Sequence, residues 1–198
     1  VPVVTIEGDW ALHAPLKLKL KPGGHGVIWK LAKEKGVFQW FAEKKRTKAL
    51  LRQINNPVAG TDNGLLGFTG VGLSKNKEFG FASCPRLLNT SEGVDIVVET
   101  EREGKYHYQL TNIEYTQFAE RGIHDTPEHI NSNYSKYPAN TNILFCDLKA
   151  VEKTLQKCAI PGLIINMKST VALLDHEGRL VHVKAGRLES TMQNIADY

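Results

Sequence analysis

The sequence predicts an α/β domain in which helices flank a mixed, partly parallel sheet. Segments rich in β-branched and aromatic residues alternate along the chain with segments of helical periodicity, as in α/β folds. The length of 198 residues and the 41% of hydrophobic residues suffice for one globular domain with a sizeable core. No internal repeat or linker divides the sequence, so we expect one domain over residues 1–198.

The first quarter of the chain is expected to form short strands followed by two helices. Residues 1–5 and 16–20 predict strands, with a turn at residues 7–9. Residues 21–26 are rich in glycine and predict a loop. From residue 27 onward the apolar side chains follow helical spacing, and Gly36 divides this stretch into two helical pieces. Residues 48–54 then predict a buried strand.

The later elements follow from the same two periodicities. Residues 55–72 combine glycines with Leu65, Leu66 and Phe68, so we expect a loop that leads into a short helix. Strands are expected at residues 79–84, 94–99, 106–115 and 142–147, and a helix at residues 148–157. Residues 126–138 are polar and loop-like. Residues 171–175 and 180–184 predict a hairpin around a turn at residues 176–178.

Composition excludes several classes of protein. The longest apolar runs, such as those at residues 143–146 and 162–165, are far shorter than the roughly 20 residues that cross a bilayer, so no membrane span is expected. The cysteines have no paired spacing, which argues against a disulfide framework and a zinc ribbon. These cysteines are Cys84, Cys146 and Cys158. The chain begins at Val1 and has no signal segment, so we expect an excised or partial chain.

Basic residues gather between residues 17 and 52, where only Glu34 and Glu43 are acidic. A solvated helix face and a surface that attracts a phosphorylated ligand both explain this charge. Nucleic acid fits less well, because Trp29, Phe38 and Trp40 recur at helical spacing and favour a buried stripe over a base-stacking platform. We therefore expect no nucleic-acid partner, although salt-sensitive binding of RNA or DNA would revive that alternative.

Gly-Gly-His-Gly at residues 23–26 lies between an expected strand and an expected helix. Glycines let the backbone approach a ligand closely, and the start of a helix directs free N–H groups at an anion. His25 adds a donor at the same place. The cluster equally suits a simple turn, and its spacing matches neither a dinucleotide-binding motif nor a phosphate loop. The residues alone indicate an anion site or a turn, without a reaction.

Polar side chains also stand at the ends of expected strands. Gln53 and Asn55 end one strand, Glu114 ends another, and Asn140 and Asn142 lead into a third. Open α/β sheets bind ligands at such ends, and amides with a carboxylate suit the hydroxyls of a sugar. Each residue singly also fits a turn or a cap.

Five runs occur in a distinctive order, at residues 21–31, 52–57, 79–86, 111–115 and 187–194. Together they resemble the eukaryotic UDP-sugar pyrophosphorylase family, especially its plastid UDP-glucose branch. The resemblance implies a Rossmann-like, glycosyltransferase-A-like nucleotidyltransferase core, of which this chain would be an incomplete, central part. It also implies that UTP and glucose 1-phosphate give UDP-glucose and pyrophosphate, with Mg²⁺, in the chloroplast. No covalent enzyme intermediate is expected.

The resemblance assigns roles to individual residues. Gly24 would contact the uridine nucleotide, and His25, the expected catalytic residue, would contact the phosphate of the sugar. Arg86 would lie near the phosphates. The glucose hydroxyls would be held by Glu114, Asn140 and Asn142. The full set of expected substrate contacts is Gly24, His25, Gln53, Asn55, Arg86, Glu114, Asn140 and Asn142.

The sequence departs from the family pattern at two positions. Val27 stands where relatives have an acidic residue, and Asn55 stands where they have a metal-holding Asp. An amide oxygen brings no charge, so Mg²⁺ affinity should fall unless Asp62 joins Asn55 as a ligand. The family's glycine-rich lysine loop and its second catalytic lysine are not in this sequence, so we expect the chain alone to be inactive. A noncatalytic sugar-nucleotide-binding or assembly module remains the alternative.

Overall fold

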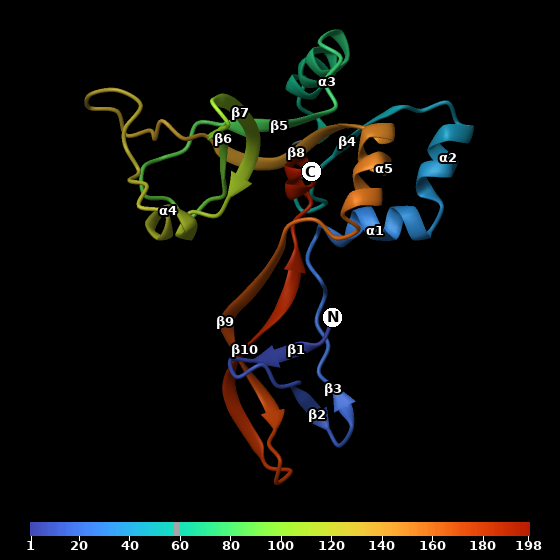
Figure 1. Ribbon diagram of the computed structural model, residues 1–198, viewed down its shortest axis with the longest axis vertical. Coiled ribbons are helices and arrows are strands. Elements are labelled where there is room, and N and C mark those ends of the chain that lie inside the picture. The colour runs from blue at the N-terminus through green and yellow to red at the C-terminus, as the bar shows by residue number, and fades with distance from the viewer. Residues whose placement is uncertain (58–59) are drawn as a thin grey trace. The chain divides into compact units, whose positions relative to one another are not determined.

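The computed structural model describes residues 1–57 and 60–198, which form two compact units (Figure 1). The first unit comprises Val1–Lys35 and Cys158–Met192, and the second comprises Gly36–Lys157 and Gln193–Tyr198. The first unit is thus built from two stretches that are far apart in the sequence. The assignment of residues 1–198 to one catalytic domain stays a prediction.

The first unit contains a three-stranded antiparallel sheet and one helix. β1 (Val3–Thr5) pairs with β10 (Leu180–Ser190), which pairs with β9 (Leu163–Leu174). β2 (Leu12–Ala14) and β3 (Lys17–Leu18) form a separate two-stranded ladder. Alternate residues of β10 face the core, because successive side chains of a strand point to opposite faces. The core consists of Val3, Ala11, Val171, Leu173 and Ala185.

The second unit contains the larger sheet. Its strand order is β4 (Lys48–Leu51), β8 (Ala139–Asp147), β6 (Val94–Arg102) and β7 (Lys105–Ile113), and β5 (Phe79–Cys84) also pairs with β8. Every pairing among the described strands is antiparallel. The α/β class is confirmed, but the expected partly parallel sheet is wrong for this part of the chain. The reason is that β8 pairs with both β4 and β5 and runs opposite to both.

The helices of both units agree closely with the helices that the sequence predicts. α5 (Leu148–Lys157) has the predicted bounds, and it buries Leu148, Val151 and Leu155 along one face, as an amphipathic helix does. α2 (Val37–Glu43) begins after Gly36, whose positive φ of 70° ends the preceding helix, α1 (Val27–Glu34). The other helices among the described residues are α3 (Gly64–Ser74), α4 (Thr116–Glu120) and the 3₁₀ turn η2 (Gln193–Asp197).

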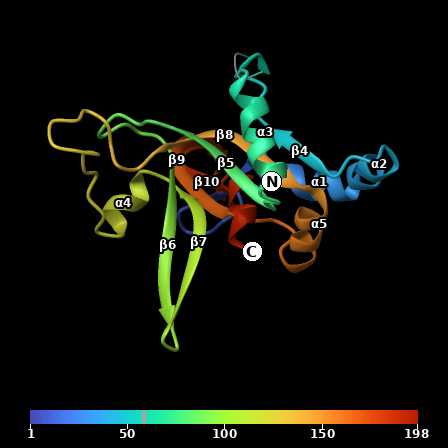
Figure 2. The ribbon, with the colours of Figure 1, turned by 90° about the horizontal axis from the view of Figure 1, so that it is seen from above.

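Several expected strands differ from those of the structure in their bounds or burial. The strand expected at residues 48–54 ends at Leu51, and it is only partly buried, since Leu50 is 38% exposed. The hairpin expected near residues 171–184 is longer, and the β6–β7 hairpin extends away from the sheet (Figure 2). Residues 58–59 of the expected loop at 55–72 lie outside the described residues.

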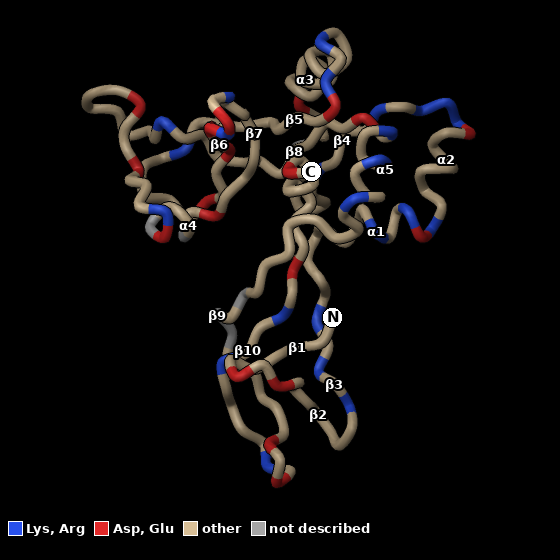
Figure 3. Tube along the Cα trace, viewed as in Figure 1, with Lys and Arg blue, Asp and Glu red and all other residues tan. Residues whose placement is uncertain are grey.

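The basic and the aromatic residues of the first quarter of the chain are distributed differently in the structure. Lysines lie on α1 and α5, whereas α2 has none and is followed by Lys44, Lys45 and Arg46 (Figure 3). Trp29 and Phe38 are buried, whereas Trp40 is 53% exposed, so the expected buried aromatic stripe is confirmed only in part. Within the described residues, no helix has the length and apolarity needed to cross a bilayer.

Candidate functional site

The strand register of the second unit directs several predicted site residues to one edge of the sheet. Leu51, the last residue of β4, faces Leu144 in β8. Gln53 and Asn55 follow β4, so the chain carries them toward the end of β8 where Asn142 lies. Gln53 is half-buried there and Asn55 is exposed.

Two further strands end at the same edge. The last residue of β5 faces Ala139, the first residue of β8. Ile113, the last residue of β7, faces Val94, which in turn faces Ala139. Arg86 and Glu114 follow these strand ends in the chain. The sheet therefore gathers polar residues from four strands without any parallel pairing.

Asn140 and Asn142 are held to each other at an irregularity in β8. The register with β5 shifts between Ala82 and Ser83, and Asn142 adopts a φ of 56°, which asparagine tolerates better than most residues. Nδ2 of Asn140 donates to Oδ1 of Asn142 at 3.2 Å, and the Asn142 backbone N–H donates to Oδ1 of Asn140 at 2.9 Å. These hydrogen bonds fix the orientation of both side-chain amides. A bulge redirects the side chains of a strand, and here the two amides hold each other in the redirected position.

A buried polar network lies beside the two asparagines. Asp95 is only 6% exposed, and its carboxylate accepts hydrogen bonds from the Ser83 hydroxyl and from Nδ2 of Asn112, the latter at 3.1 Å. Gln193 Nε2 donates to Oδ1 of Asn112 at 3.2 Å. Burial raises the pKa of Asp95, and the two bonds to its carboxylate only partly offset that effect.

This network lies next to the sheet edge that carries Asn140 and Asn142. Ser83 faces Asn140 in the register, and the Asn140 N–H donates to the Gly93 carbonyl at 2.9 Å. Sequence reasoning missed Asp95, although a charged residue between Val94 and Ile96 in an apolar strand was the available signal. A buried charge in such a place is retained only where hydrogen bonds hold it.

The side chain of Arg86 is buried and bonded to neighbouring residues of the protein. It is 1% exposed, and its guanidinium donates to the Thr90 carbonyl at 3.1 Å and to the Ser135 hydroxyl at 3.0 Å. Nη2 lies 2.7 Å from Oδ1 of Asp125. Desolvation raises the pKa of Asp125, but bonds from Ser135, the Asn89 backbone and Arg86 outweigh it and leave the pKa lowered. This geometry gives Arg86 a packing role, and its contact with phosphate stays a prediction.

The metal-binding role of Asn55 and Asp62 stays a prediction. Oδ1 of Asp62 accepts the Gly64 N–H at 2.7 Å at the start of α3, and both Asn55 and Asp62 are exposed. The described residues contain no group of three or more His, Cys, Asp or Glu side chains that could hold a metal ion. The donor set therefore does not fit a dedicated Mg²⁺ cage, which would need more oxygen ligands.

Gly24 and His25 belong to the first unit, where the end of β10 backs their loop. The Met192 backbone N–H donates to Nδ1 of His25 at 3.0 Å, and Trp29 Nε1 donates to the Met192 carbonyl at 2.8 Å. Because Nδ1 accepts a hydrogen bond, a neutral His25 carries its proton on Nε2. That tautomer presents an N–H donor of the kind a phosphate requires.

The glycines of this loop are needed for close approach to Ser190. The Gly26 N–H donates to the Ser190 carbonyl and the Ser190 N–H to the Gly23 carbonyl, both at 2.8 Å. A Cβ at Gly26 would lie 2.7 Å from the Ser190 carbonyl carbon, and Gly24 has a φ of 83°. Arg187 Nε also donates to the Pro22 carbonyl at 2.6 Å. The first and last of the five sequence runs therefore meet in space.

Comparison with solved structures defines the class of fold. The chain superposes on UDP-glucose pyrophosphorylase from Leishmania major with a TM-score of 0.63 and 19% identity, covering 100% of this chain and 41% of that one. UDP-glucose phosphorylase from Trypanosoma brucei gives a TM-score of 0.61 and 14% identity, covering 98% of this chain and 39% of that one. At such identities the likeness concerns the fold alone.

Sequence comparison identifies a particular relative. The chain is 44% identical over 202 residues to UTP--glucose-1-phosphate uridylyltransferase 3, chloroplastic, of Arabidopsis thaliana. The match covers 100% of this chain, which spans 23% of the relative's length. No protein-family model matches the chain. The expected resemblance to UDP-glucose pyrophosphorylases is therefore confirmed.

Proposed function

We propose that this chain forms part of a uridylyltransferase that makes UDP-glucose and pyrophosphate from UTP and glucose 1-phosphate. The identity of 44% along the whole chain to a uridylyltransferase is the observation that carries the proposal. The chain would contribute mainly the part that binds the sugar nucleotide. We place the second-unit sheet within a glycosyltransferase-A-like, Rossmann-related core, and we place the protein in the chloroplast, in keeping with the relative's name.

The chemistry would depend on alignment of the two substrates. An oxygen of the glucose 1-phosphate attacks the α-phosphorus of UTP, the bond to the β-phosphate breaks, and pyrophosphate leaves. His25 would donate a hydrogen bond to the sugar phosphate from Nε2, in agreement with the tautomer that its contact with Met192 favours. Gly24 would contact the uridine nucleotide.

The sugar would be held at the polar edge of the second-unit sheet. Amides and carboxylates form directional hydrogen bonds with hydroxyl groups, and Asn140 and Asn142 are already fixed by their mutual bonds. The carboxylate of Glu114 belongs to an exposed residue whose backbone N–H donates to Gln117 Oε1 at 2.9 Å. Gln53 would supply a further contact to the sugar or the nucleotide. The proposed role of Mg²⁺ is to neutralise the phosphates of UTP; we assign no step to Asn55 or Asp62.

A noncatalytic sugar-nucleotide-binding module is the second candidate, favoured by Asn55 and Val27 in place of acidic residues. Calorimetry with UDP-glucose on the intact protein, paired with a pyrophosphate-release assay, separates the two. Binding with turnover supports the enzyme. Binding without turnover supports the module, and absence of binding contradicts both.

The Asn140→Ala variant of the intact protein tests the sugar edge. We expect the KM for glucose 1-phosphate to rise about tenfold, with little change in the KM for UTP, because one or two hydrogen bonds to the sugar are lost. Asn133→Ala, in an exposed loop, is the matched control and should behave as the unmodified protein. Equal kinetics for both variants would remove Asn140 from the site.

A further inference from the structure

A cavity of about 800 Å³ lies in the second unit, away from the proposed sugar edge. Asp147, the last residue of β8, and Lys48, the first residue of β4, both line it. Asn142 precedes Asp147 by five positions, which corresponds to about 16 Å along a strand. From Asp147 the cavity extends along the sheet to Phe81, which faces Leu144, and none of the residues proposed for the sugar edge lines it.

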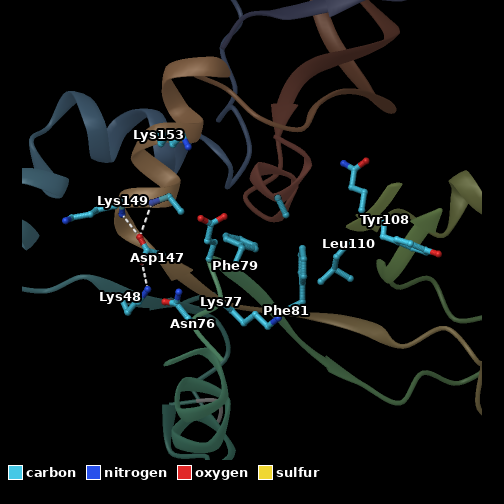
Figure 4. A pocket seen from close by; sticks show the side chains of 14 residues that line it. Lys48, Asn76, Lys77, Phe79, Phe81, Tyr108, Leu110, Asp147, Lys149 and Lys153 are labelled. Atoms are coloured by element: carbon cyan, nitrogen blue, oxygen red, sulfur yellow. Dashed lines mark hydrogen bonds and ion pairs between the residues drawn. The ribbon is translucent and has the colours of Figure 1, made fainter. Parts of the chain in front are cut away.

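The cavity has a cationic side and an apolar side. Figure 4 shows Lys48, Lys149 and Lys153 with Asp147 on the side of α5, and Tyr108 and Leu110 on the opposite side. Phe79 and Phe81 lie between the two sides, and Lys77 extends toward Phe81 (Figure 4). Such an arrangement suits a ligand with an anionic end and a flat or apolar end.

The positive charge of this lining is only partly neutralised. Lys48 is paired with Asp147, which leaves Glu78 as the other carboxylate of the lining. Lys77, Lys149 and Lys153 are exposed, and the ion pairs found within the described residues engage none of them. The lining therefore carries excess positive charge.

Two of these lysines, Lys149 and Lys153, lie one helical turn apart on α5, where like charges weakly repel each other. Glu152 stands three residues from Lys149, at a spacing where opposite charges attract. The start of α5 is already capped, since Oδ1 of Asp147 accepts the backbone N–H groups of Lys149 at 2.8 Å and Ala150 at 3.0 Å. Side-chain amines, rather than the helix terminus, are thus the groups available to an anion.

The apolar side offers flat surfaces. Phe79 and Phe81 lie two residues apart on β5, with ring centroids 5.5 Å apart at an interplanar angle of 71°. Tyr108 is 66% exposed and Leu110 is 43% exposed, both on β7. An aromatic base stacks readily against such side chains.

We propose that this cavity binds a nucleotide polyphosphate at a second site, distinct from the proposed substrate site. The base would lie against Phe81 and Tyr108, and the phosphates would contact Lys77 and Lys153. Lysine is a common phosphate ligand, and the cavity volume falls within the range of small-molecule pockets.

Calorimetry with ATP and with inorganic triphosphate on the intact protein tests this site. ATP should bind more tightly than triphosphate, because only ATP reaches the aromatic side. Lys77→Ala/Lys153→Ala should weaken ATP binding about tenfold or more. The matched control, Lys33→Ala/Lys44→Ala, removes the same charge from exposed helix-end positions that do not line the cavity, and it should leave ATP binding unchanged.

Two results would overturn the proposal. Equal weakening in both double variants would mean general charge attraction, and equal affinity for ATP and triphosphate would mean that the aromatic side takes no part. UDP-glucose binding, measured in the same samples, should be unaffected by Lys77→Ala/Lys153→Ala and shows that the variant is folded. If the unmodified protein binds ATP but not UDP-glucose, the substrate proposal fails and this one stands.

Discussion

Asp95 is a buried carboxylate near the start of β6, and the side-chain hydrogen bonds that it accepts come from neutral donors. Ser83 and Asn112 supply those bonds, and Asn112 is held in turn by Gln193. Oε1 of Gln193 is buried without a hydrogen-bond partner in the described structure. Gln193 donates to Asn112, and Asn112 donates to Asp95, so both amides direct their N–H groups toward the carboxylate. The negative charge of Asp95 therefore sets the orientation of both amides.

Replacing Asp95 should reveal how much this network contributes to stability. Asp95→Ala leaves the Asn112 amide unpaired in a buried site, so we expect the free energy of unfolding to fall by about 1–3 kcal/mol. Asp95→Asn should cost less, because the Asn112 and Gln193 amides can turn over and reverse the direction of donation. Urea unfolding measures both variants, and an equal cost for the two would contradict the role given to amide orientation.

The same residue sets an expected pH dependence. The pKa of Asp95 is raised in the folded state, so the folded protein binds more protons than the unfolded chain between the ordinary Asp pKa, about 3.9, and the raised value. In that window the contribution of Asp95 to stability falls as pH rises. Unfolding measured across this window should show that slope in the unmodified protein and lose it in Asp95→Asn.

At the scale of elements, α5 depends on one side chain that does two things. Asp147 caps the helix through the N–H groups of Lys149 and Ala150, and it also pairs with Lys48. Desolvation raises the pKa of Asp147, but the bond from Lys48 and the backbone bonds outweigh it and lower the pKa. Asp147 thus connects the start of α5 to the first residue of β4.

Substitutions at Asp147 should separate the two contributions. Asp147→Asn keeps a capping oxygen and loses only the ion pair, whose two side chains are each 20% exposed, at a cost of about 1 kcal/mol. Asp147→Ala loses the cap as well, so we expect a further loss of about 1 kcal/mol. Because the folded pKa is lowered, the ion-pair contribution is present above the ordinary Asp pKa and is lost as pH falls. Thermal unfolding at pH 7 and pH 3 checks both the order and the pH effect.

Replacing Gly26 and Gly67 by alanine should change the free energy of unfolding in opposite directions. Gly26→Ala places a Cβ against the backbone of Ser190 and Thr191, and we expect a loss of about 1–3 kcal/mol in the free energy of unfolding. Gly67→Ala, inside α3, meets nothing within 4 Å, so it should gain about 0.5–1 kcal/mol from the better helix propensity of alanine. A stable Gly26→Ala protein would contradict the close packing of the loop on β10.

The elements also mark what the sequence was able to predict. Local patterns sufficed for α1, α2 and α5, because helical spacing and glycine punctuation act over a few residues. Strand direction was not predictable, because alternation of β8 says nothing about whether β4 or β5 runs with or against it. The end of β4 at Leu51 was equally hidden, since the apolar Ile54 beyond it is fully exposed.

At the scale of the whole molecule, the strand-end amides were predicted as a site, and their arrangement was not. The gathering of Gln53, Glu114 and Asn140 at one edge depends on antiparallel register between strands that are distant in sequence. The glycine loop was predicted to approach a ligand, yet its close approach in the structure is to Ser190. Burial and pairing of Arg86 also depend on remote residues that no local motif encodes.

The pairing of β1 with β10 has a consequence for synthesis of the chain on the ribosome. Val3 pairs with Arg187, so β1 must wait until the chain has been made as far as residue 187 before its partner exists. At usual rates of translation this wait lasts about ten to forty seconds. During that time the loop that carries His25 lacks Ser190 and Met192 behind it. The proposed phosphate contact can therefore be organised only after most of the second unit has been made.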